Sequence, residues 1–211
     1  MRHFAEPRTG DETRFKRAVR YLRGKTRLVL RFPWHQGSAH ITGYVDGNFA
    51  GCTWTRKSTS AGALIWGQCC LKTYSKTQAT IALSSGESEL AAVVRGATEL
   101  LGLQSVFADF GLCNTRLALC SDATAAIGIV DREGLGRVRH LATADLWVQQ
   151  RVRSGELSIS KWPGKDNVAD IGTKGVDGLT LTKHLLAFGF AQFEGRAQCA
   201  PELKQTVGMR C

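Results

Sequence analysis

Four carboxylate residues, far apart along the chain, each lie where a strand is expected to end or a helix to begin. They are Asp46 in YVDGNFAG, Glu89 in LSSGESELAA, Asp122 in LALCSDATAAI and Asp170 in DNVADIGTK. Acids with this placement can converge on one point of a folded α/β domain. Convergent carboxylates repel one another unless cations lie between them, so the arrangement predicts a divalent-metal site.

Three of these acids also have a simpler interpretation when each is taken alone. Asp46 precedes Gly47, a pair that is common in turns. Asp122 follows an apolar strand and could cap the next helix. Asp170 could be a solvated charge, although Asp166 is the better candidate for a helix cap. The metal hypothesis therefore depends on all four acids together.

Glu87 and Glu89 are predicted to have different roles. Ser84 and Glu87 match the capping box S-x-x-E, in which the glutamate closes the first turn of a helix. Glu89 has no such local role and lies beside the apolar stripe of that helix, where a carboxylate needs a partner. We therefore assign capping to Glu87 and metal binding to Glu89.

The composition favours a polyanionic partner. The chain has 211 residues and a formal charge of +10, with 43% hydrophobic and 22% charged residues. This charge suits nucleic acid or an anionic membrane surface. No apolar run approaches the ~20 residues that span a bilayer, and the opening MRHFAEPRTG has no apolar h-region, so neither a signal peptide nor a membrane partner is expected. None of the seven cysteines forms a CxxC pair, so free thiols in a reducing, intracellular compartment are predicted.

Hydrophobic periodicity predicts the elements that must position the acids. Helices are expected at 11–24, 85–110, 123–130, 143–155 and around Asp170, and strands at 26–32, 40–46, 61–67, 70–75, 115–121 and 156–162. This order implies an α/β fold with a mixed sheet and helices on both faces. Residues from 190 onward lack periodicity and are predicted to be a loose tail.

With these motifs, the chain resembles the ribonuclease H domain of copia-type LTR retrotransposon Pol polyproteins. The resemblance covers about residues 11–190 and rests on GYVDGNFAGCTWTRKSTSAGALIWG, ALSSGESEL, CSDATAAI and DNVADIGTK. The helix FKRAVRYLRG is similar to the segment that joins the reverse transcriptase to the nuclease. The chain departs from the family at Gly47, Asn48 and Phe49, where a second acid and a tryptophan are usual. The loop PGKDN also lacks the histidine of many cellular ribonucleases H.

The resemblance implies a ribonuclease H-like fold with a five-stranded mixed sheet flanked by helices. It also implies three regions: residues 1–36 as a remnant of the reverse transcriptase connection, 37–178 as the nuclease domain, and 179–211 as a C-terminal helix and tail. The chain would then be a fragment of a Pol polyprotein or a decayed genomic copy.

The activity implied by the resemblance is hydrolysis of the RNA strand of RNA–DNA hybrids with two Mg²⁺ ions, or with Mn²⁺ in their place. By the same resemblance, Asp46 bridges both ions, Asp170 completes the nucleophile-side ion, and Glu89 and Asp122 hold the leaving-group ion. Two ions of this kind grip the attacking and departing oxygens of a phosphodiester.

Two groups of residues are expected to contact the nucleic acid. Recognition of the RNA 2′-hydroxyl is assigned to Glu89 and to the backbone around Ser85 and Gly86. Phosphate contacts, which carry little sequence preference, are assigned to Arg56, Lys57, Ser58, Thr59, Arg137, Arg139 and His140. The expected partners are the hybrid and the reverse transcriptase domain of the same polyprotein, in the cytoplasm or a virus-like particle.

Three rival interpretations remain open at this level. The chain could be a catalytically decayed ribonuclease H fold that serves as a basic nucleic-acid-binding module. It could be another metal nuclease of the same broad fold, such as an integrase or a resolvase. It could also be a metal-free interaction domain in which the acids are helix caps.

Overall fold

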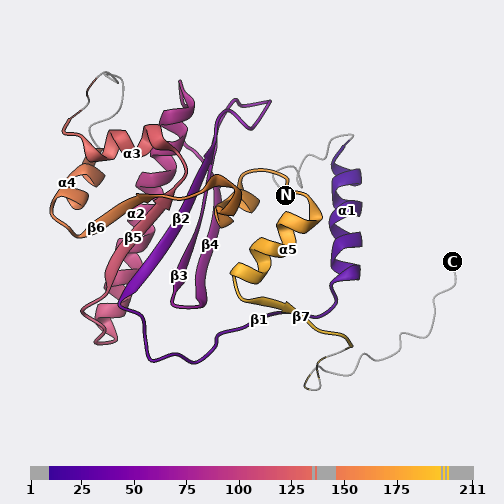
Figure 1. Cartoon of the computed structure of the whole chain (residues 1–211). Helices are drawn as coiled ribbons and strands as arrows, with labels where there is room; N and C mark the ends of the chain where they lie inside the picture. The colour runs from indigo at the N-terminus through magenta and orange to yellow at the C-terminus, as the bar shows by residue number, and fades with distance from the viewer. Residues whose placement is uncertain (1–9, 135, 137–145, 196, 198, 200–211) are drawn as a thin grey trace, which may run out of the picture. The chain divides into compact units, whose positions relative to one another are not determined.

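A computed structural model describes residues 10–134, 136, 146–195, 197 and 199 of the chain (Figure 1). The chain divides into two compact units. The larger unit is Arg31–Gly189, and the smaller one joins the described residues of 1–30 to those of 190–211. The predicted residues Arg137, Arg139 and His140 lie outside the described residues.

The larger unit is built on a five-stranded mixed sheet with the strand order β4-β3-β2-β5-β6. The strands are β2 (His40–Asn48), β3 (Thr59–Trp66), β4 (Cys69–Thr77), β5 (Arg116–Ser121) and β6 (Leu157–Lys161). Strands β2, β3 and β4 pair antiparallel, whereas β2 pairs parallel with β5, and β5 with β6. The five-stranded mixed sheet predicted from the sequence is confirmed.

Helices cover both faces of this sheet (Figure 1). They are α2 (Ser85–Asp109), α3 (Thr124–Asp131), α4 (Trp147–Arg153), the 3-10 helices η2 (Gly164–Asp166) and η3 (Val168–Gly172), and α5 (Gly178–Ala187). Adjacent residues of a strand point to opposite faces. Val45 belongs to the core on the α2 face, and its neighbour Asp46 is bonded to Thr173, just after η3, so η3 covers the other face.

The core lies between α2 and the centre of the sheet. Its α2 side chains Leu90, Val93, Ala97 and Leu100 are at most 1% exposed, as is Val45 on β2. Burial of a Leu or Val side chain contributes about 1.5–3 kcal/mol, so this helix is firmly anchored to the sheet. The same helix sets the position of Glu89 in its first turns.

Helix α2 is also the one helix among the described residues with the length and hydropathy of a membrane span. The sequence interpretation had found no apolar run of this length. Its buried face against the sheet is what the core helix of a globular domain shows, and it carries Glu87, Glu89, Arg95 and Glu99.

The smaller unit holds α1 (Asp11–Gly24) and a two-stranded antiparallel sheet of β1 (Leu28–Leu30) and β7 (Phe190–Gln192). The prediction of a loose tail from residue 190 is wrong at its start, because 190–192 pair with β1. Periodicity could not reveal a strand of three residues. The predicted strand 26–32 is likewise reduced to its three central residues, and α1 has no buried residue.

Two further sequence expectations concern boundaries and thiols. The larger unit ends at Gly189 and therefore includes helix α5, most of which the sequence interpretation placed in a separate C-terminal region, 179–211. The described cysteines are free thiols, as predicted: Cys52, Cys69, Cys70, Cys113, Cys120 and Cys199.

Candidate metal centre

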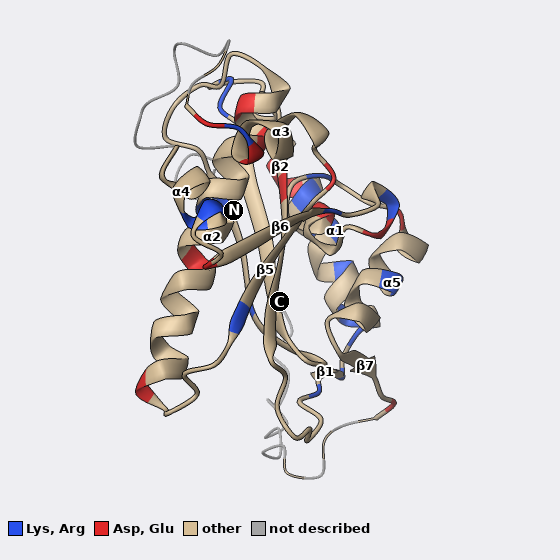
Figure 2. Ribbon diagram, turned by 60° about the vertical axis from the view of Figure 1, so that its left-hand side comes forward, with Lys and Arg blue, Asp and Glu red and all other residues tan. Residues whose placement is uncertain are grey.

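The carboxyl ends of the three parallel strands meet at one edge of the sheet, and this edge gathers the acids. The last paired residues of β2 and β5 are Tyr44 and Cys120. Asp46 and Asp122 each follow two residues later, so they lie side by side. Strand β6 runs parallel to β5 and leads at the same edge into η2 and η3, which carry Asp170. Figure 2 shows acidic residues gathered at this end of the sheet, beside β2 and α3.

Three of the four predicted ligands meet closely. One carboxylate oxygen from each of Asp46, Glu89 and Asp122 lies within 4.8 Å of the other two. Asp46 is 5% exposed, and the other two residues are half-buried. Oxygens at this separation can coordinate a common cation.

Glu89 is directed to the site by the start of α2. The Ser84 hydroxyl oxygen accepts a hydrogen bond from the Glu87 backbone N–H at 3.3 Å, as the predicted capping box requires. The Glu87 carboxylate reaches back to the Leu83 N–H at 2.9 Å. With Glu87 engaged in capping, Glu89 lies two residues further along and accepts a hydrogen bond from the Gly47 N–H at 3.1 Å. The capping role predicted for Glu87 is thus confirmed, and metal binding by Glu89 stays a prediction.

Gly47 allows α2 to approach β2 closely enough for this contact. A Cβ atom at residue 47 would lie 2.5 Å from the Ser88 carbonyl oxygen and 2.9 Å from its carbon. Both are backbone atoms in the first turn of α2, so a side chain here would push the helix start away. The absence of a side chain at Gly47 therefore allows Glu89 to lie beside Asp46.

Asp170 lies beside the other three acids but is not part of the close group. It is 8% exposed, and its carboxylate forms an ion pair with Lys174 at 2.9 Å. It still interacts electrostatically with Asp46 and Asp122. The structure therefore brings the four predicted residues to one place, and the carboxylate oxygens of three of them lie within 4.8 Å of one another.

The simpler interpretations of the acids do not fit this structure. Asp46 lies inside β2, not in a turn. Residue 123 is the N-cap of α3, which has no side-chain cap bond, so Asp122 is not its cap. Asp166 pairs with Lys183, and the cap of η3 is Asn167. The predicted capping role of Asp166 is therefore wrong, because its side chain points to α5 instead.

Burial and the repulsion between neighbouring carboxylates raise the pKa values of Glu89, Asp122 and Asp170. Burial raises the pKa of Glu89 to about 8, and the charges of Asp46 and Asp122 add to the rise. Burial also raises the pKa of Asp122, with a contribution from Asp46. Burial raises the pKa of Asp170 too, against the opposing effect of Lys174. The prediction that at least one acid would titrate above its usual range is confirmed.

This donor set fits a hard divalent cation. The ligand atoms are carboxylate oxygens, with no histidine or cysteine in the group. Magnesium, manganese and calcium prefer oxygen ligands, and softer metals prefer nitrogen and sulfur. A cation here would also offset the repulsion between the carboxylates.

The predicted phosphate ligands at the β2–β3 turn divide into two kinds. Arg56 is exposed and Lys57 is half-buried. Ser58 is fully buried, and its hydroxyl accepts a hydrogen bond from the Ala50 N–H at 3.0 Å, whereas Thr59 is 6% exposed. In this structure the Ser58 hydroxyl stabilises the turn between β2 and β3. Phosphate binding by this segment stays a prediction.

Several residues around the acids were missed from the sequence. The Thr173 hydroxyl donates to Asp46, and the Asn48 amide donates to the Thr173 carbonyl oxygen at 2.9 Å. The buried Asn167 amide donates to the Val45 carbonyl oxygen at 2.9 Å, which fixes η3 to β2. Lys174 follows Asp170 by four residues, a spacing typical of ion pairs, so this signal was available.

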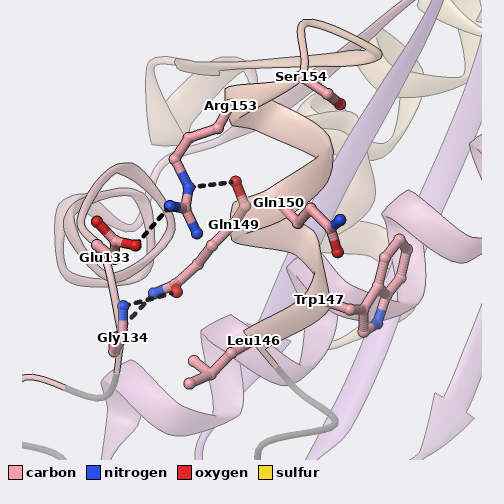
Figure 3. Close-up of a pocket in the computed structure, with 8 residues that line it drawn as sticks. All are labelled: Glu133, Gly134, Leu146, Trp147, Gln149, Gln150, Arg153 and Ser154. Carbon is pink, nitrogen blue, oxygen red and sulfur yellow. Dashed lines mark hydrogen bonds and ion pairs between the residues drawn. The ribbon is translucent and has the colours of Figure 1, made fainter.

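A pocket in the larger unit lies away from these acids. It has a volume of about 810 Å³ and contains none of the four acids. Figure 3 shows the buried Gln149 at its wall, where the Gln149 amide bonds the backbone N–H and carbonyl of Gly134 at 3.1 Å. Its lining residues are Glu133, Gly134, Leu146, Trp147, Gln149, Gln150, Arg153 and Ser154.

Comparison with known proteins identifies relatives among retrotransposon polyproteins. No family model matches the chain. The chain is 30% identical over 165 residues to the retrovirus-related Pol polyprotein from transposon TNT 1-94 of Nicotiana tabacum, which covers 74% of this chain and 12% of that protein. It is 26% identical over 180 residues to the Pol polyprotein from transposon RE2 of Arabidopsis thaliana, covering 84% of this chain and 12% of that protein.

Among solved structures, LC11-RNase H1, isolated from compost by a metagenomic approach, is similar with a TM-score of 0.45 and 14% identity. The similarity covers 64% of this chain and 94% of that one. The chain spans about 12% of the length of the two polyproteins named above. By these relatives, the chain is similar to a segment of the retrovirus-related Pol polyproteins of plant transposons.

Proposed function

We propose that the larger unit is a divalent-metal-dependent nuclease that hydrolyses the RNA strand of RNA–DNA hybrids. The observation that carries the proposal is the group of Asp46, Glu89 and Asp122, whose oxygens lie within 4.8 Å of one another. The relatives are Pol polyproteins related to those of retroviruses, which supports a role in reverse transcription.

Each acid would contribute to cleavage by holding a cation at a fixed place. Asp46, Glu89 and Asp122 would be the direct ligands, and Asp170 would complete the set. A bound pair of Mg²⁺ or Mn²⁺ ions supplies charge for the attacking and the departing oxygens of the phosphodiester. The hydrogen bonds from Gly47 to Glu89 and from Thr173 to Asp46 orient the carboxylates before the cation arrives.

The surroundings of the acids suit a nucleic-acid backbone. Ser85 and Gly86 begin α2 beside Glu89, and the N-terminus of a helix attracts phosphate. Arg56 and Lys57 lie in the turn after β2, the strand that carries Asp46. Such contacts would position a duplex without reading its sequence. The 2′-hydroxyl of the RNA strand would be recognised by Glu89 and the adjacent backbone.

The proposal includes the polyprotein context. The reverse transcriptase domain of the same polyprotein would be the partner that produces the hybrid. Cleavage would then take place where reverse transcription occurs, in the cytoplasm or in a virus-like particle.

The experiment compares the wild-type chain with Asp46→Asn on a labelled RNA–DNA hybrid in millimolar Mg²⁺. The wild type should cut the RNA strand, and Asp46→Asn should lose at least about 100-fold in rate, since a bridging ligand is removed. Asp109→Asn is the matched control, because Asp109 is an exposed acid at the far end of α2.

The outcome also separates the rival functions. Equal cutting by the wild type and Asp46→Asn would end the enzyme proposal. Hybrid binding without cutting in either Mg²⁺ or Mn²⁺ would favour the decayed, basic binding module, which the charge of +10 also supports. Cutting of duplex DNA with no preference for hybrids would favour an integrase-like or resolvase-like nuclease.

A further inference from the structure

Lys174 places a positive charge beside the group of acids. Its ammonium nitrogen lies 2.9 Å from Asp170 Oδ1, four residues earlier in the chain. The side chain of Asp170 is 11% exposed and that of Lys174 is 52% exposed. One end of the ion pair is thus fixed in the protein, and the other borders solvent.

The charge of Lys174 acts on all four carboxylates. Burial lowers the pKa of the Lys174 ammonium, but Asp170, Asp46 and Asp122 outweigh this effect and raise the pKa overall. Lys174 in turn opposes the rise in the pKa of Glu89. Lys161 also acts on Asp122, but from an exposed position at the end of β6. Lys174 therefore has the position of a shared counter-ion.

The backbone that carries Lys174 is held in place, although its side chain is not enclosed. Thr173 is tied to Asp46 through its hydroxyl and to Asn48 through its carbonyl. The Ser75 hydroxyl donates to the Gly172 carbonyl oxygen at 2.5 Å. The Lys174 side chain can therefore rotate into solvent while the segment 172–174 keeps its contacts with β2 and β4.

We propose that Lys174 is a built-in counter-cation of the acid cluster, and that a divalent ion must displace it from Asp170. This inference rests on the proposed metal site. It accounts for the separation of Asp170 from the other three acids, because Asp170 is engaged with Lys174 in the metal-free protein. Once Lys174 leaves, Asp170 is available to the cation.

The test uses Lys174→Met, which keeps most of the length and the apolar stem of the side chain and removes its charge. The control is Lys183→Met, since Lys183 forms a comparable half-exposed ion pair with Asp166 away from the acid cluster. Each protein is melted in EDTA, and its affinity for Mg²⁺ and for Mn²⁺ is measured by titration calorimetry.

Without metal, Lys174→Met should melt about 2–4 °C below the wild type, because four carboxylates lose their shared cation. With metal, it should bind Mg²⁺ at least about fivefold more tightly, since no ammonium has to be displaced. Lys183→Met should match the wild type in metal affinity.

Two outcomes would overturn the inference, and only one of them would also overturn the proposed metal site. If the wild type binds Mg²⁺ or Mn²⁺ and Lys174→Met binds with equal or weaker affinity, the counter-cation role fails while the metal site stands. If the wild type binds neither ion, the inference and the proposed metal site fail together.

Discussion

The protonation of Glu89 makes the stability of the fold depend on pH. The pKa of its carboxyl group is 4.5 in an unfolded chain, and burial is the main cause that raises the pKa to about 8 in the folded protein. Between these values the folded protein binds more protons than the unfolded chain. The free energy of unfolding of the metal-free protein should therefore fall as the pH rises from about 4.5 to 8.

Replacement of Glu89 by glutamine should remove this dependence. In EDTA at pH 8, Glu89→Gln should be more stable than the wild type by ~1–2 kcal/mol, a value discounted for the solvent that reaches the site. At pH 4.5 the two proteins should be equally stable. Urea unfolding at several pH values measures the difference.

Glu99 on the same helix is the matched control with the opposite sign. It pairs with Lys72 and Arg95, which outweigh burial and lower its pKa. Its ionised form stabilises the fold above the pH at which an unfolded glutamate titrates, so Glu99→Gln should be less stable than the wild type at pH 8. A loss of stability in Glu89→Gln as well would contradict the raised pKa that we assign to Glu89.

At the scale of elements, the contact between β2 and the start of α2 decides whether Glu89 reaches Asp46. Gly47→Ala places a Cβ against the Ser88 backbone, at 2.5 Å from its carbonyl oxygen. We expect it to lower the free energy of unfolding by about 1–3 kcal/mol, as overpacking does. It should also weaken Mg²⁺ binding, because Glu89 moves with the helix.

Gly102→Ala is the control for this prediction. Gly102 lies in the same helix, and a Cβ there would meet nothing within 4 Å. Since alanine is the better helix former, this variant should be more stable by about 0.5–1 kcal/mol and should keep its metal affinity. Equal metal affinity in Gly47→Ala and the wild type would show that the close approach is not needed for the site.

The sequence was sufficient for the elements whose pattern is long and regular. Helix α2 and the five strands of the larger sheet were predicted because apolar residues repeat over many turns or alternate within a strand. Their ends placed Asp46, Glu89 and Asp122 correctly at one edge. Asp170 was expected in a short helix, and it lies in a 3-10 helix of five residues, which is too short to show a period.

What the sequence did not show are contacts between distant segments. The role of Gly47 depends on how closely α2 approaches β2, and the bond from Asn167 to Val45 joins residues 122 positions apart. The pairing of 190–192 with β1 also depends on contacts across the length of the chain. Local periodicity and capping motifs contain no information of this kind.

At the scale of the whole molecule, a net charge of +10 is combined with a cluster of acids. Because these acids repel phosphates, the binding of nucleic acid must use basic side chains outside the cluster. The affinity for a polyanion falls with salt in proportion to the number of phosphates that are neutralised. If Arg56 and Lys57 each contact a phosphate, the double variant Arg56→Gln, Lys57→Gln should reduce the slope of log K against log [salt] by about 2.

The measurement is fluorescence anisotropy of a labelled RNA–DNA hybrid in EDTA, which prevents cleavage, over a series of KCl concentrations. Arg17→Gln, Arg20→Gln is the control, because it removes the same two charges from the exposed surface of α1 in the smaller unit. We expect the control to keep the slope of the wild type. If both double variants reduce the slope equally, net charge alone governs binding, and the turn between β2 and β3 has no special place in the interface.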